Sequence, residues 1–332
     1  MRSAFGSSQH FARKFTNESA VESLTSRHVV NESGTHQMSF GLLAPLTLAA
    51  LAFVTTLRSP PPPPVVHSTI RVVDVRGAAA LVARGASVLD ARDGGAFSGG
   101  HIPGAQLYAW SLFTGPAAAR GRLRSDLDSV AAGLAALGVD ETRPTLVYGA
   151  AGLGQGEEGH AAWLLALLGH PDIAMLDGGF DAWRSAGRPV VTTTAAARVG
   201  RFSARVRSEL LIDRARLGGR GPRVLDVRSS AEFVGASPRG EARGGHIPGA
   251  LSMDWRTVLD ERGRIRPVQK LRESLESAGV DASEPFVVVC TNGVRSGFVA
   301  SVLAARSIAA PAVVDGGMLE WAADPSAPLS TT

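Results

Sequence analysis

The sequence predicts an α/β protein of two tandem modules, each a parallel β-sheet with helices on both faces. Its 332 residues, 45% of them hydrophobic and 19% charged, suffice for two cores of ordinary size. A set of motifs recurs once along the chain, at a distance of about one domain. Within each copy, short apolar runs such as Val287–Val289 alternate with helical stretches such as Leu271–Ala278. Such alternation is typical of parallel sheets that are covered on both faces.

A leader precedes the first module. We expect residues 1–66 to be largely disordered, apart from residues 38–57, which are twenty residues without a charge. That length just spans a bilayer's hydrocarbon, and the run Pro60–Pro64 would form a stiff spacer. A buried core helix fits Pro45 poorly. We therefore expect an export signal or membrane anchor, and a protein of the cell envelope. The alternative is a soluble cytoplasmic enzyme with a mis-assigned, disordered leader. Met38 directly precedes the uncharged segment and is a second candidate for the true start.

The repeat defines the two modules. Five blocks recur in the same order: Val88–Arg92 as Val224–Arg228, Gly100–Ala105 as Gly245–Ala250, Trp110 as Trp255, Gly138–Asp140 as Gly279–Asp281, and Asp177–Gly179 with Trp183 as Asp315–Gly317 with Trp321. Because the period is that of a whole domain, the pattern indicates a duplication and not a solenoid. We expect modules over residues 67–192 and 209–330, joined by a linker over residues 193–208 that carries no repeat motif.

The segment around the chain's one cysteine predicts a nucleophile. An apolar strand, Phe286–Val289, runs into Cys290, a short loop with Gly293 follows, and a helix is expected to begin near Ser296. This order places the thiol at a strand's carboxyl end, facing a helix N-terminus that stabilises anions. Arg295 adds a positive charge, and both effects favour the reactive thiolate. The alternative is a small cysteine that only fills the core.

Taken together, the blocks LDVR, GHIPGA, CTNGVRS and DGG with a following tryptophan resemble the rhodanese family. The resemblance covers about residues 68–330 and is strongest to the tandem-domain thiosulfate/3-mercaptopyruvate sulfurtransferases. It implies a five-stranded parallel sheet in each module. It also implies transfer of a sulfane sulfur from thiosulfate or 3-mercaptopyruvate, both small anions, to cyanide or a thiol. The sulfur would be carried as a cysteine persulfide, without a cofactor or a metal.

The resemblance also assigns residues of the site. The catalytic role falls to Cys290, and the donor-binding loop to Thr291, Asn292, Gly293, Val294 and Arg295. Pro238-Arg239 matches a pair that supplies a substrate-binding arginine, so Arg239 is a second candidate anion clamp. The sequence departs from the family at Glu232, which stands before Phe233 where an arginine is common. This departure weakens the case for 3-mercaptopyruvate, and an arginine in the loop favours thiosulfate.

The first module lacks a nucleophile. When the two copies are aligned without gaps, Gly149 takes the position of Cys290. The glycine-rich run that follows contains Glu157 and Glu158, which we expect to repel an anionic substrate. The run lacks the Lys-Ser/Thr ending of a phosphate-binding loop, so nucleotide binding is not expected.

Other classes of function fit the sequence less well. Although the pI is near 9.9, the net charge is only +4 and the arginines are scattered, so we expect no nucleic-acid partner. One Cys and eight dispersed His do not supply a metal site. Cys290 and Arg295 enclose four residues, one fewer than the loop of cysteine phosphatases needs to surround a tetrahedral anion. A non-enzymatic module that carries a persulfide or binds a partner remains the alternative to the enzyme.

Overall fold

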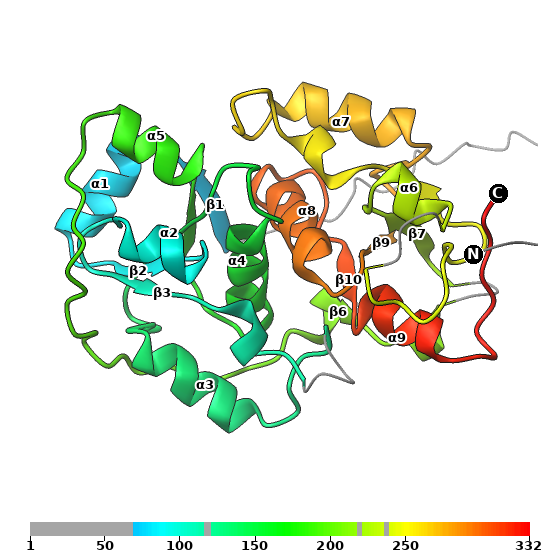
Figure 1. The fold of residues 1–332 in the computed structure, drawn as a ribbon, viewed down its shortest axis with the longest axis horizontal. Coiled ribbons are helices and arrows are strands. Elements are labelled where there is room, and N and C mark those ends of the chain that lie inside the picture. The colour runs from blue at the N-terminus through cyan, green and yellow to red at the C-terminus, as the bar shows by residue number, and fades with distance from the viewer. Residues whose placement is uncertain (1–68, 116–120, 218–220, 236–238) are drawn as a thin grey trace, which may run out of the picture. The chain divides into compact units, whose positions relative to one another are not determined.

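The chain contains two five-stranded parallel sheets with helices on both faces, as predicted (Figure 1). This computed structural model describes residues 69–115, 121–217, 221–235 and 239–332. The expected anchor at residues 38–57 and its proline spacer lie outside these residues. Within the part of the chain that is described, no helix is long and apolar enough to cross a membrane.

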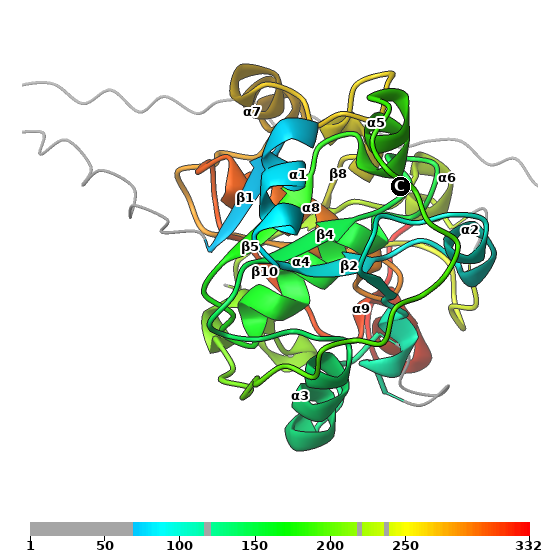
Figure 2. The same ribbon diagram turned by 90° about the vertical axis from the view of Figure 1, so that its left-hand side faces the viewer.

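The first module follows the order strand, helix, strand throughout. Its elements are β1 (Ile70–Val73), α1 (Val75–Ala83), β2 (Ser87–Asp90), α2 (Gly94–Ser98), β3 (Ala105–Leu107), α3 (Leu127–Ala136), β4 (Thr145–Tyr148), α4 (Glu157–Leu167), β5 (Ile173–Leu176) and α5 (Gly179–Ser185). The strands lie in the order β1-β5-β4-β2-β3. Figure 2 shows α1 and α5 on one side of this sheet and α3 and α4 on the other.

The second module repeats this arrangement, except that a short 3-10 helix, Arg214–Arg216, stands where the first module has α1. Its elements are β6 (Leu211–Ile212), β7 (Arg223–Asp226), α6 (Ser230–Phe233), β8 (Leu251–Ser252), α7 (Val268–Ser277), β9 (Phe286–Val289), α8 (Val294–Ala305), β10 (Ala312–Val314) and α9 (Gly317–Ala323). The strand order β6-β10-β9-β7-β8 is that of the first sheet, strand for strand. The sequence repeat is therefore also a repeat of topology.

The two modules share one hydrophobic core, with α4 and α8 packed against each other. Both helices are apolar on nearly all sides, which is expected of a helix without a solvent face. Trp163 and Phe298 belong to the shared core, and the Ser301 hydroxyl donates a 2.8 Å hydrogen bond to the Gly159 carbonyl. Because the cysteine loop leads directly into α8, this packing places the loop beside the first module.

Candidate active site

Cys290 lies between a buried strand and the start of a helix. It follows β9, and α8 begins at Val294, two residues earlier than predicted. Gly293 caps the helix with φ of +91°, a backbone conformation that favours glycine. The sulfur has no exposed area, and the Ser296 hydroxyl donates to it at 3.4 Å. The thiol thus lies near the positive end of a 12-residue helix, where an anion is stabilised.

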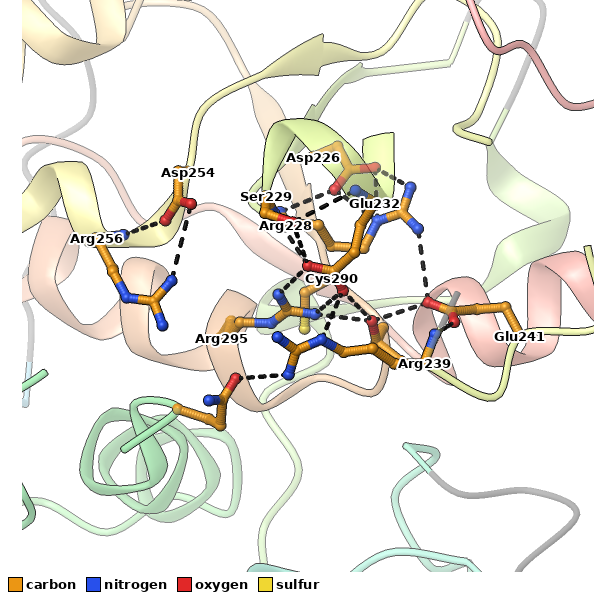
Figure 3. A network of polar contacts seen from close by, with 12 residues as sticks. Asp226, Arg228, Ser229, Glu232, Arg239, Glu241, Asp254, Arg256, Cys290 and Arg295 are labelled. Carbon is orange, nitrogen blue, oxygen red and sulfur yellow. Dashed lines mark hydrogen bonds and ion pairs between the residues drawn. The ribbon is translucent and has the colours of Figure 1, made fainter. Parts of the chain in front are cut away.

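Arg295 is buried and fully paired with a carboxylate. Its Nη1 and Nη2 atoms donate to Oε2 and Oε1 of Glu232, both at 2.8 Å, and Nη2 also donates to Thr291 Oγ1 at 2.8 Å (Figure 3). Burial lowers the pKa of Arg295, but the hydrogen bonds to Glu232 outweigh it and raise the pKa above its usual value. Arg295, which was expected to bind the donor anion, is therefore already paired with the Glu232 carboxylate.

Glu232 is held from several sides. In a capping box at the start of α6, its Oε2 accepts from the Ser229 backbone N–H at 3.2 Å, and it also accepts from the Ser229 hydroxyl at 2.8 Å. Its Oε1 lies 3.3 Å from Nε of Arg239. Burial raises the pKa of Glu232, but the hydrogen bonds from Arg295 outweigh it and hold the pKa at about 2. Glu232 is therefore a carboxylate at any physiological pH.

Two further carboxylates surround the same loop. Glu241 is buried, accepts from Thr291 Oγ1 at 3.0 Å, and lies 3.6 Å from Nη1 of Arg228. Arg228 in turn donates to Asp226 at 2.7 Å. The role of Glu241 could not be predicted, because the residue belongs to none of the repeated motifs and meets its partners only in the folded chain.

A cleft of about 300 Å³ opens above the cysteine loop and is lined by both modules. The predicted residues that line it are Arg239, Thr291, Asn292, Val294 and Arg295, and the first module adds Trp110, Ser111, Gln155 and Glu157. About half of the Arg239 side chain is exposed, and its Nη1 donates to Gln155 Oε1 at 3.2 Å. The structure thus brings five of the predicted residues together at the cleft, while Cys290 lies buried and, like Gly293, does not line it. The first module adds a wall that the sequence did not indicate.

The first module has the same strand–loop–helix arrangement at the equivalent position, but the Glu158 side chain occupies the space of a nucleophile. Gly149 follows β4 as Cys290 follows β9, and Glu158 is the second residue of α4 as Arg295 is of α8. A Cβ atom at Gly149 would overlap the Glu158 carboxyl group. Burial raises the pKa of Glu158 to about 7. The expectation that Glu158 repels substrate is wrong, because its carboxyl points into the core, whereas Glu157 does line the cleft.

Comparison with protein families matches the Rhodanese-like domain over residues 70–186 and again over 213–324. The chain belongs to the rhodanese family. A thiosulfate sulfurtransferase of Gallus gallus is 31% identical over 191 residues, 56% of this chain and 65% of that protein. The putative thiosulfate sulfurtransferase SseB of Mycobacterium tuberculosis (strain CDC 1551 / Oshkosh) is 29% identical over 250 residues, 73% of this chain and 87% of that protein.

Among solved structures, SseA from Escherichia coli, described as a 3-mercaptopyruvate sulfotransferase, has the same fold with a TM-score of 0.64. The two are 23% identical, over 75% of this rhodanese chain and 98% of SseA. The match to the Gallus gallus protein spans less than two thirds of that relative's length.

Proposed function

We propose that this chain is a sulfurtransferase that moves a sulfane sulfur from a small anionic donor to cyanide or a thiol, through a persulfide on Cys290. The observation that carries the proposal is the position of Cys290, between the end of β9 and the N-terminus of α8. The names of the family members, thiosulfate and 3-mercaptopyruvate sulfurtransferases, support the reaction class. Neither a metal nor an organic cofactor takes part.

The reaction is a double displacement. The Cys290 thiolate attacks the outer sulfur of thiosulfate, a new S–S bond forms, the S–S bond of the donor breaks, and sulfite leaves with the electron pair. A nucleophilic acceptor then attacks the terminal sulfur and regenerates the thiolate, so that cyanide becomes thiocyanate and a thiolate becomes a persulfide. The helix N-terminus and the Ser296 hydroxyl stabilise the anionic sulfur in each state.

Arg239 is the residue we propose to receive the donor first. Its half-exposed guanidinium lies at the cleft, whereas Arg295 is buried against Glu232. Because Cys290 has no exposed area, a donor reaches the sulfur only after side chains above it move. Thiosulfate is the preferred donor over 3-mercaptopyruvate, since Glu232 replaces the arginine that would hold the carboxylate of the latter.

Steady-state kinetics with thiosulfate and cyanide test the proposal. A covalent relay predicts ping-pong kinetics, with parallel lines in double-reciprocal plots. Cys290→Ser should abolish turnover, and Asp254→Asn, which changes a charge outside the cleft lining, should leave it intact. Intersecting lines, or full activity of Cys290→Ser, would contradict the proposal. A wild-type protein that accepts sulfur but never releases it would favour the non-enzymatic persulfide carrier.

A further inference from the structure

The charges around Cys290 cancel. Among the described residues of this cluster, the arginines are Arg228, Arg239 and Arg295, and the carboxylates that pair with them are Asp226, Glu232 and Glu241. Figure 3 shows these six side chains gathered around the cysteine. A site that binds a doubly charged anion would be expected to hold a surplus of positive charge.

The Glu232 side chain cannot easily move aside when a donor binds. Its side chain is only 2% exposed, and both oxygens are occupied by Arg295. The Ser229 hydroxyl and backbone N–H also donate to Oε2, at 2.8 and 3.2 Å, as part of the capping box that starts α6. Moving the carboxylate would break the cap and leave Arg295 buried without its partner, which is costly. Its charge therefore remains directly behind Arg239 and Thr291, which line the cleft.

We propose that Glu232 determines donor specificity, so that the site prefers sulfane donors with one negative charge, such as organic thiosulfonates, over the dianion thiosulfate. Arg239 offers one partly exposed positive charge to the donor. A second negative charge on a donor held by Arg239 would lie close to Glu232, because Oε1 of this carboxylate is 3.3 Å from Nε of Arg239 and Arg295 is already paired with it. Like charges at such short range repel strongly in a buried site.

The inference rests on the proposed sulfur transfer, and the reaction follows the same displacement at the outer sulfur. With methanethiosulfonate, the Cys290 thiolate attacks the terminal sulfur, the S–S bond of the donor breaks, and methanesulfinate leaves in place of sulfite. Both donors carry the transferred sulfur on an oxidised sulfur atom and differ by one unit of charge. 3-Mercaptopyruvate is less informative, because its carboxylate is several bonds away from the sulfur.

The experiment compares kcat/KM for methanethiosulfonate and for thiosulfate, with cyanide as acceptor. Glu232→Gln keeps the size of the side chain and one oxygen for Arg295, but removes the charge. We expect the wild type to prefer methanethiosulfonate, and Glu232→Gln to shift the ratio toward thiosulfate by about tenfold, or about 1.4 kcal/mol. Asp254→Asn is the matched control, since it removes a carboxylate that caps a 3-10 helix and lies apart from the cluster in Figure 3. Its ratio should equal that of the wild type.

Two results would overturn the inference. One is a ratio in Glu232→Gln within twofold of the wild type. The other is a wild-type preference for thiosulfate, and this comparison needs no variant, so it decides the question even if Glu232→Gln does not fold. Failure of the underlying function is distinguishable, because the wild type would then take sulfur from neither donor.

Discussion

Replacing Arg295 with alanine should destabilise the protein mainly by leaving a carboxylate unpaired. Glu232 is 2% exposed and accepts two hydrogen bonds of 2.8 Å from Arg295. Although burial raises the pKa of Glu232, these hydrogen bonds hold it at about 2 against an ordinary value of 4.5. At about 1.36 kcal/mol per pKa unit, the difference corresponds to roughly 3 kcal/mol. Because Ser229 also donates to this carboxylate, we expect Arg295→Ala to lose about 2–3 kcal/mol at pH 7.

The pH dependence of this loss has a definite sign. The pKa of Glu232 is depressed in the folded state, so its contribution is complete above about pH 4.5 and is lost as the pH falls through about 2. In Arg295→Ala the unpaired carboxylate takes up a proton at a higher pH. The difference in unfolding free energy between the wild type and Arg295→Ala should therefore shrink by about 1 kcal/mol between pH 7 and pH 4.

Urea unfolding at the two pH values measures this difference. The control is the double variant Glu232→Met with Arg295→Met, which removes both charges and keeps most of the volume. It should be more stable at pH 7 than Arg295→Ala, because no buried charge is left alone. If the loss is equal at both pH values and the double variant is no more stable than the single one, the ion pair does not have the role assigned to it.

Three further predictions concern other parts of the chain. Arg239→Ala should raise KM for the donor several-fold and leave kcat nearly unchanged, because the side chain is half-exposed at the cleft; an unchanged KM in steady-state assays would mean that the donor binds elsewhere. Gly149→Cys should not create a second persulfide site, since the Glu158 carboxyl occupies the space for its Cβ. Thiol titration after incubation with donor should find no second reactive cysteine, and finding one would contradict this prediction. We also propose that residues 38–57 attach the protein to the cell envelope. Cell fractionation should find the full chain in the envelope fraction and a version starting at Val65 in the soluble fraction. Equal recovery of both versions, uncleaved, in the soluble cytoplasmic fraction would refute this.

The sequence predicted those features that depend on local order and on repetition. The repeated motifs indicated two equivalent sheets, and the strand before Cys290 with the glycine after it placed the thiol at a helix N-terminus. The partner of Arg295 could not be predicted, because Glu232 is 63 residues away in the chain and meets it only through tertiary packing. Glu158 was misjudged for a related reason, since a charged residue in a glycine-rich run is usually solvated, whereas the fold buries this side chain next to Gly149.

Intact-protein mass spectrometry of the first half-reaction shows directly whether Cys290 carries the transferred sulfur. The purified full chain is incubated with a sulfane donor in the absence of an acceptor, and then with cyanide. We expect that the wild type gains the mass of one sulfur atom, that cyanide removes it, and that Cys290→Ser never gains it. A stable gain of sulfur by Cys290→Ser, or turnover by the wild type without any sulfur-bearing intermediate, would contradict the assignment of Cys290 as the sulfur carrier.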